Sequence, residues 1–195
     1  MVSTLSNAGI VMGSGVHNKL IGQIGENLVA AKLGTLGYYA SPYAGNVPGF
    51  DLTAVDSKTL SSFPIQVKCS TANTLVHSQI DRWIETSIDS TGKYSFGELL
   101  QLDHPNMLWI MVNLPHGQIE NARYFICRES DIQKLAVERF IAFIKRHNYR
   151  RPNGGNSKQA ILTLKELDRY EDNWSLIAPA SKTVTTHDGR ESNDL

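Results

Sequence analysis

Apolar and polar positions recur with two different periods along this chain, and together they predict a mixed α/β protein. From Asn18 to Leu36 the apolar residues return every three or four positions, which predicts a helix with one buried face. Tyr38 to Tyr43 is expected to form an edge strand. Phe50 to Val55 and Phe63 to Cys69 predict two further strands, joined by a hairpin connection at Asp56-Ser57-Lys58.

The second half of the chain carries signals of both kinds. Met107 to Leu114 is an unbroken apolar run of strand length, as expected for a central strand covered on both faces. Arg123 to Cys127 predicts another strand, and a helix capped by Ser130 or Asp131 is expected to run to about His147. The remaining expected elements are a strand at Gln159 to Leu164, a helical turn at Lys165 to Tyr170 and a packed anchor at Trp174 and Ile177.

Residues 71–105 have the weakest pattern and are interpreted as an insert over the functional site. The spacing of Ile80, Trp83, Ile84 and Ile88 predicts a short amphipathic helix there, followed by a helical turn within residues 96–102. Residues 1–16 are predicted to be a flexible leader and 179–195 a disordered tail. The chain is therefore expected to hold one α/β domain, 17–178, with a mixed sheet flanked by helices on both sides.

Composition narrows the function classes only a little. The 195 residues suffice for one core, and the 19 basic and 19 acidic residues cancel, so contact with nucleic acid would need a local basic patch. Cys69 and Cys127 lie in predicted strands and are expected to be reduced core thiols. Because the chain has no apolar run of membrane-spanning length and no secretory pattern, a cytoplasmic protein without a membrane partner is expected.

The candidate chemistry lies on the two neighbouring strands near the middle of the predicted domain. Strand alternation places Gln66 and Lys68 on one side, and pairing of the strands brings both beside Asp51. Glu26 lies on the first helix, where it is either a site residue facing the sheet or an ordinary solvated glutamate. A buried lysine is costly unless an anionic group lies opposite, and a phosphodiester with its metal is one such group.

The order Glu26, Pro48-Gly49-Phe50-Asp51, Gln66-Val67-Lys68 resembles the PD-(D/E)XK nuclease superfamily, which includes restriction enzymes, Holliday junction resolvases and Mrr-like proteins. The resemblance covers residues 18–70 by motif and about 107–177 by pattern alone. It implies a restriction-endonuclease-like fold and an endonuclease that hydrolyses phosphodiester bonds in DNA with Mg²⁺ or Mn²⁺.

Carried over residue by residue, the resemblance implies that Asp51 and Gln66 hold the metal, with the carbonyl of Val67 as a further ligand. It implies that Lys68 assists the attacking water, and that Glu26 binds a second metal or positions a metal-bound water. Gln66 departs from the commoner glutamate and removes one negative charge from the site. In addition, Gly49 and Phe50 separate the proline of the motif from Asp51.

A cluster of basic residues near a flexible glycine-rich loop is the candidate contact with DNA. Its members are Lys145, Arg146, Arg150, Arg151 and Lys158. The alternative for Lys145 and Arg146 is that they complement the carbonyl end of the preceding helix.

A second function class stays open beside the enzyme. The amide at Gln66 and the zero net charge also suit a catalytically inactive nucleic-acid-binding or assembly module on the same scaffold. The sequence does not distinguish DNA from RNA, gives no preference for a DNA structure or pathway, and leaves a homodimer open.

Overall fold

The computed structural model describes residues 14–43 and 49–177, and its N-terminal part is a helix followed by three antiparallel strands. The helix α1 (Ser14–Thr35) begins inside the stretch predicted as a leader, the rest of which lies outside the described residues. Strands β1 (Tyr38–Pro42), β2 (Leu52–Asp56) and β3 (Ser62–Ser70) follow as predicted. Gly37 lies in the turn between α1 and β1 and has a φ of 90°, a left-handed backbone conformation that favours glycine.

These strands join β7 (Leu108–Asn113) and β8 (Arg123–Arg128) in one five-stranded mixed sheet. The order is β1-β2-β3-β7-β8, and every neighbouring pair is antiparallel except β3 with β7, which is parallel. All six residues of β7 are buried, which confirms the prediction of a strand covered on both faces.

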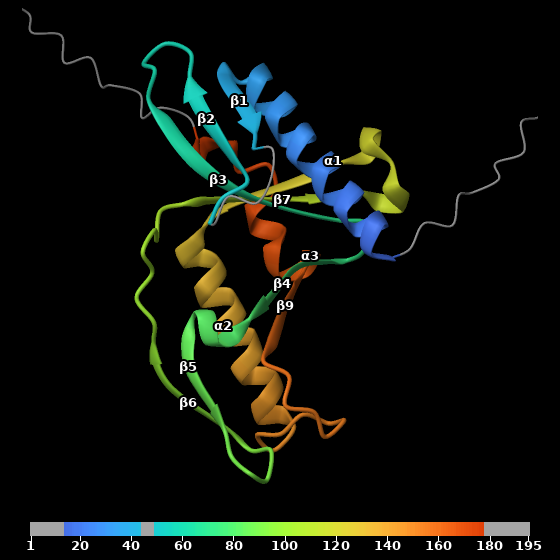
Figure 1. The fold of residues 1–195 in the computed structure, drawn as a ribbon, viewed down its shortest axis with the longest axis vertical. Coiled ribbons are helices and arrows are strands. Elements are labelled where there is room, and N and C mark those ends of the chain that lie inside the picture. The colour runs from blue at the N-terminus through green and yellow to red at the C-terminus, as the bar shows by residue number, and fades with distance from the viewer. Residues whose placement is uncertain (1–13, 44–48, 178–195) are drawn as a thin grey trace, which may run out of the picture.

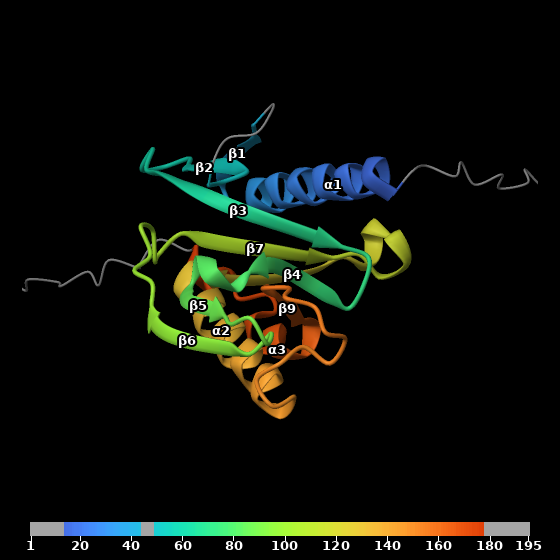
Figure 2. The same ribbon diagram turned by 60° about the horizontal axis from the view of Figure 1, so that its bottom comes forward.

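A helix covers each face of the sheet, as predicted (Figure 1). The even residues of β7 pack with Val29 and Leu33 of α1, whereas Trp109 and Met111 pack with α2 (Glu129–Arg146). The cap of α2 differs slightly from the prediction. Arg128 is the N-cap residue, and its backbone N–H donates to the carboxylate of Asp131, which lies at the third helical position. Figure 2 shows α1 on one side of the sheet and α2 on the other.

The segment between β3 and β7 is not helical, so the two helical elements predicted within residues 71–105 are wrong. It forms β4 (Thr74–Gln79), a 3₁₀ turn η1 (Ile80–Arg82), β5 (Ile84–Ile88) and β6 (Tyr94–Leu99). Strands β5 and β6 form a hairpin, and β4 pairs with β9 (Gln159–Thr163) beside α2. The apolar positions that suggested an α-helix instead pack into the core beside α2 from the η1 turn and from β5.

Short elements complete the chain and anchor its end. They are η2 (Pro115–Gly117), η3 (Ile119–Asn121), α3 (Leu164–Leu167), η4 (Asp168–Tyr170) and η5 (Trp174–Leu176). The predicted anchor is present, because Ile177 is buried and its carbonyl accepts a hydrogen bond of 2.6 Å from the Tyr38 hydroxyl. The predicted tail, 179–195, lies outside the described residues. Within the described ranges, no helix combines the length and apolar character needed to cross a membrane.

Candidate active site at the divergence of strands β2 and β3

The candidate site lies where β2 and β3 separate. Their antiparallel ladder ends at Leu52 and Ile65, and the backbone N–H of Asp51 closes it by donating to the Ile65 carbonyl at 2.9 Å. Strand β3 continues beyond this point, where β2 no longer pairs with it. The backbone N–H of Val67, which points toward the β2 side, therefore meets the side chain of Asp51. The backbone N–H of Val67 donates to Asp51 Oδ2 at 2.7 Å. The end of the ladder therefore fixes the Asp51 carboxylate against β3.

Gln66 completes a compact polar group with these atoms. Its side chain is buried, and its Nε2 donates to Asp51 Oδ2 and to the Val67 carbonyl oxygen, the latter at 3.3 Å. Asp51 Oδ2 and the Val67 carbonyl oxygen thus both point at the Gln66 Nε2, whose N–H groups carry partial positive charge. The position of Gln66 beside Asp51 was predicted from the alternation of β3 and the pairing of the strands, whereas a role for the Val67 carbonyl was implied only by the resemblance.

Lys68 lies on the same side of β3 as Gln66, facing the layer that contains α2. Its Nζ is 5.8 Å from the centroid of the Trp109 ring, on the neighbouring strand β7. Burial lowers the pKa of Lys68, the carboxylate of Asp51 opposes that shift, and the nearby guanidinium of Arg82 adds to it. Lys68 is therefore a poorly solvated amine held beside an acid.

Glu26 reaches this group from the opposite face of the sheet. Helix α1 can approach the uncovered part of β3 closely because it has Gly25 there, and a Cβ at that position would overlap the side chain of Cys69. Burial raises the pKa of Glu26, and the negative charge of Asp51 raises it further. Glu26 is therefore partly buried and lies within electrostatic range of Asp51 and Lys68.

The donor set at this point suits a hard cation. Mg²⁺ and Mn²⁺ take oxygen ligands, and the site offers the Asp51 carboxylate, the Val67 carbonyl and the Gln66 amide, with the Glu26 carboxylate near them. The residues that the structure describes hold no cluster of three or more His, Cys, Asp and Glu side chains placed for a metal. The candidate donors accordingly combine two carboxylates with an amide and a backbone carbonyl.

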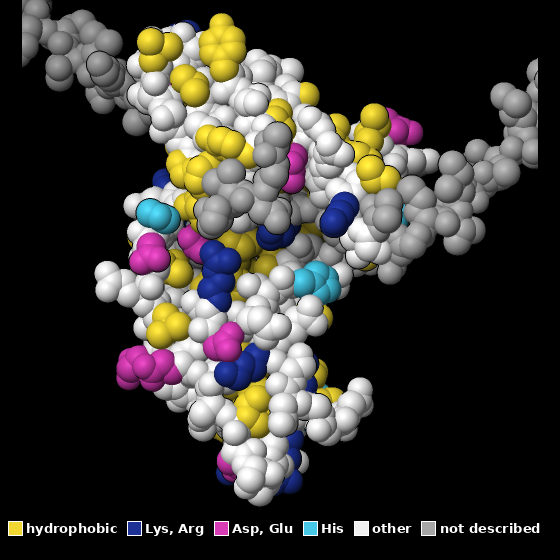
Figure 3. Space-filling model, in the orientation of Figure 1, with side chains coloured by type: hydrophobic (Ala, Val, Ile, Leu, Met, Phe, Trp, Pro, Cys, Tyr) yellow, Lys and Arg dark blue, Asp and Glu magenta, His cyan; other side chains and the backbone are white. Residues whose placement is uncertain are grey.

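Two hollows open beside the group, so it is not sealed in the interior. One, of about 460 Å³, is lined by Lys68 together with His17, Asn18 and His77. The other, of about 590 Å³, is lined by residues next to the site, among them Phe50, Arg82, Leu102, His104 and Glu129. The space-filling view shows Lys and Arg side chains over a hydrophobic floor between the upper and lower parts of the molecule (Figure 3).

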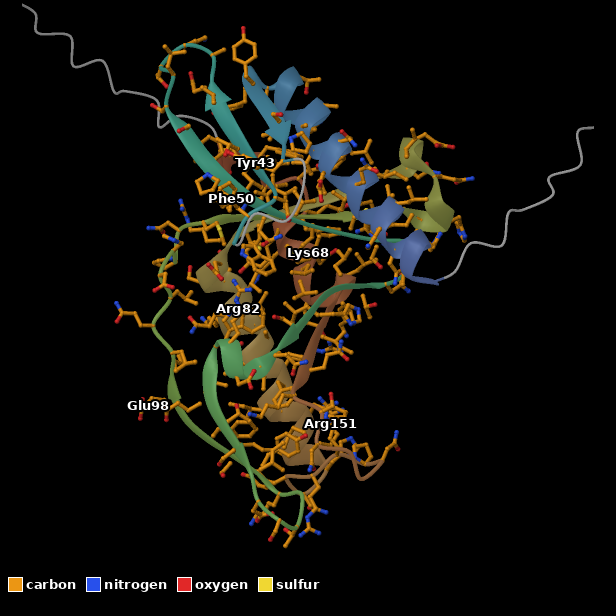
Figure 4. The ribbon with its side chains drawn as sticks, in the orientation of Figure 1. Tyr43, Phe50, Lys68, Arg82, Glu98 and Arg151 are labelled. Carbon is orange, nitrogen blue, oxygen red and sulfur yellow. The ribbon has the colours of Figure 1, made fainter. Side chains whose placement is uncertain are left out.

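The predicted DNA-binding residues do not all lie at one place. Arg151 lies far from Lys68 (Figure 4), and Lys145 and Arg146 are in the last turn of α2, whereas Lys158 pairs with Asp81, the neighbour of Arg82. Three of them hold the loop that precedes β9. Arg151 donates to the carbonyls of Ser157 and Gln159, Arg150 donates to Thr91, and Lys158 pairs with Asp81 at 3.1 Å. Lys145 and Arg146 are exposed in the last turn of α2, where they also complement the helix dipole.

Sequence reasoning missed two charged residues at the site. Arg82 follows β4 in the η1 turn, and Glu129 begins α2; the two are joined by a hydrogen-bonded ion pair of 2.8 Å. No sequence signal pointed to them, because the structure of residues 71–105 was predicted wrongly. The cysteines, by contrast, behave as predicted, since burial raises the pKa of Cys69 to about 11 and the described residues contain no disulfide.

No protein-family model, curated protein or solved structure matches this chain.

Proposed function

We propose that this protein is a metal-dependent endonuclease of the PD-(D/E)XK type, which hydrolyses phosphodiester bonds in DNA. One observation carries the proposal: Asp51, Gln66 and the Val67 carbonyl meet at one point, with the poorly solvated amine of Lys68 on the same side of β3. An acid, an amide and an amine in this arrangement suit metal-assisted hydrolysis of a phosphodiester, which needs an activated water and stabilisation of the developing negative charge.

Asp51 and Val67 would hold Mg²⁺ or Mn²⁺, and Gln66 would turn its amide so that Oε1 instead of Nε2 faces the shared point. The bound cation would supply charge neutralisation for the phosphate oxygens and acidify a bound water. Lys68 Nζ, whose lowered pKa increases its neutral fraction, can accept a proton from the attacking water or donate hydrogen bonds to the phosphate. Glu26 can orient a water on the side that α1 covers.

The architecture supports the same proposal at a coarser level. A mixed sheet with a helix on each face, an acid at the end of the β2–β3 ladder and a lysine on β3 together agree with a restriction-endonuclease-like fold. One feature departs from the simplest form of such a layout. The described connection between the parallel strands β3 and β7 consists of strands and one 3₁₀ turn, without an α-helix.

The test is divalent-dependent cleavage by the Asp51→Ala and Lys68→Ala variants. Supercoiled, linear, branched and single-stranded DNA would be incubated with each purified protein, with and without Mn²⁺. We expect the parent to cut at least one substrate and both variants to lose that activity by two or more orders of magnitude. Lys134→Ala, which removes an exposed lysine of α2, is the control. Variants that cut like the parent would refute the assignment.

One observation favours the alternative of a nucleic-acid-binding module without catalysis. The Gln66 amide already satisfies the two oxygens that a cation would use, and the site holds one carboxylate fewer than a glutamate at this position would give. Calorimetric titration with Mg²⁺ and Mn²⁺ separates the two functions. A binding signal that Asp51→Asn abolishes supports the enzyme, whereas no signal at millimolar metal supports the module.

A further inference from the structure

Arg82 is held next to the proposed site by a buried partner. Its Nη2 donates to Glu129 Oε1 at 2.8 Å, and the Glu129 side chain is 5% exposed, whereas that of Arg82 is 44% exposed. Because Glu129 is buried, its carboxylate would be costly to leave without a partner. This cost keeps the Arg82 guanidinium oriented toward Glu129. The remaining N–H groups of Arg82 have no protein acceptor among the described residues, and the side chain lines the hollow of about 590 Å³.

Arg82 and Lys68 share one aromatic neighbour. The guanidinium carbon of Arg82 lies 5.7 Å and the Nζ of Lys68 lies 5.8 Å from the centroid of the buried Trp109 ring. An aromatic face attracts both cations and keeps each in place without neutralising its charge. The two labelled side chains both lie between the sheet and the lower part of the molecule (Figure 4).

The guanidinium of Arg82 is near enough to Lys68 to lower the pKa of that lysine, and two cations that share one aromatic neighbour indicate a site for an anion. Glu129 balances Arg82, and Asp51 balances Lys68, so a cation bound at Asp51 would leave an excess of positive charge over Trp109. A phosphate can accept hydrogen bonds from a guanidinium and an ammonium at the same time.

We propose that Arg82 is a phosphate-binding residue of this site, oriented by Glu129, and that it holds the backbone phosphate next to the one that Lys68 contacts. This inference rests on the proposed function and adds the path of the substrate. The DNA strand runs from Lys68 past Trp109 and Arg82 toward the hollow lined by Phe50, Leu102 and His104, and the adjoining nucleotide lies in that hollow.

The experiment measures DNA affinity as a function of salt in Ca²⁺, an ion that occupies oxygen sites and generally does not support cleavage by Mg²⁺ enzymes. Fluorescence anisotropy with labelled oligonucleotides would compare the parent with Arg82→Gln. We expect Arg82→Gln to weaken binding by about tenfold and to reduce the slope of log affinity against log salt by about 1, as the loss of one phosphate contact predicts. Calorimetric binding of Mn²⁺ without DNA should stay within about twofold of the parent, because Arg82 is not a metal ligand.

Arg82→Gln leaves Glu129 buried without its partner, so a double variant guards against misfolding. Arg82→Gln with Glu129→Gln removes both charges and keeps a hydrogen-bonding pair, and it should lose the same salt slope. The matched control is Arg123→Gln with Glu171→Gln, which removes an ion pair of 2.6 Å at the opposite end of β8 from the α2 junction. This control should retain the parent affinity and slope.

The outcomes distinguish the two proposals. If the parent binds Mn²⁺ and cleaves DNA but both Arg82 variants keep its affinity and slope, the inference on Arg82 is wrong and the proposed function stands. If the parent binds no Mn²⁺ and cleaves nothing, yet the Arg82 variants lose affinity and slope, the nuclease is refuted and the phosphate site stands. A parent that binds no DNA at any salt concentration overturns the inference on Arg82, whatever the metal titration gives.

Discussion

Replacing Gln66 with glutamate, the commoner residue in the superfamily that the chain resembles, tests the geometry of the site most directly. In the structure the Gln66 amide donates to Asp51 Oδ2 and to the Val67 carbonyl. Gln66→Glu keeps the shape of the side chain but removes both donated hydrogen bonds. It also places a second carboxylate against Asp51.

The magnitude follows from two contributions. A hydrogen bond to a charged acceptor contributes about 1.5–3 kcal/mol. Two carboxylates about 4 Å apart repel each other by roughly 4 kcal/mol at an effective dielectric constant of 20, and the nearby ammonium of Lys68 offsets a large part of this. A net destabilisation of about 3 kcal/mol is expected, which lowers the melting temperature of a chain of this size by about 6–12 °C.

The loss should depend on both pH and metal. One carboxyl of the Asp51–Glu pair would have a raised pKa in the folded state, so the folded variant would bind more protons than the unfolded chain. The deficit is therefore largest at about pH 8 and shrinks as the pH falls toward the carboxyl range. Mg²⁺ at a hundredfold excess over its dissociation constant would restore about 2.7 kcal/mol.

The assay is thermal unfolding in EDTA and in Mg²⁺, at pH 8 and at a pH in the carboxyl range. Gln133→Glu is the control. Gln133 also donates two hydrogen bonds from a partly buried amide, but its acceptors are the backbone carbonyls of Trp83 and Leu100. Its glutamate variant should lose stability that Mg²⁺ does not restore. The reasoning is refuted if Gln66→Glu in EDTA at pH 8 melts like the parent, or if Mg²⁺ stabilises both glutamate variants equally.

Three further predictions follow from neighbouring residues. Gly25→Ala should destabilise the fold by about 1–3 kcal/mol in chemical denaturation, because its methyl group would overlap Cys69, whereas Gly22→Ala, with no atom within 4 Å, should be neutral or stabilising by up to about 1 kcal/mol. Glu26→Gln should raise the melting temperature at neutral pH by about 1–2 °C, because the pKa of Glu26 is raised in the folded state and its charge is therefore unfavourable there. This gain should vanish below the pKa of a glutamate in the unfolded chain. An equal gain at all pH values would contradict the prediction. Lys68→Met should abolish cleavage without loss of stability at pH 7, because the lowered pKa of Lys68 makes its charge unfavourable in the fold. Parent stability should rise with pH between the folded and unfolded pKa values, and the methionine variant should lack that rise.

The sheet could be predicted from the sequence because each of its strands has a local pattern that matches its final surroundings. β2 and β3 alternate so that every second residue faces α1, and β7 is apolar throughout because both faces are covered. Such patterns need no knowledge of the rest of the chain. The convergence of Asp51, Gln66 and Lys68 followed from the same alternation.

The segment from β4 to β6 could not be predicted in this way. Apolar residues at positions 80, 83, 84 and 88 fit a helix as well as they fit a 3₁₀ turn followed by a strand with positions 84, 86 and 88 facing inward. What decides between them is the tertiary partner, since β4 pairs with β9, more than 80 residues further along the chain. Arg82 and Glu129 were missed for the same reason, because only this packing brings the η1 turn to the start of α2.

The place where β2 ends is what makes the proposed active site possible in this sheet. A strand edge inside a fold must satisfy its N–H and carbonyl groups, and Asp51 satisfies the N–H of Val67 directly. Among the described residues, the Val67 carbonyl receives the longer bond from Gln66 at 3.3 Å, a weak partner that a cation can replace. A glutamate at position 51 would carry its carboxylate past the Val67 N–H and could not close the ladder in this way. The short acid is therefore required by the sheet as well as by the proposed chemistry, which explains how one residue can both end a strand pair and present an oxygen to a metal.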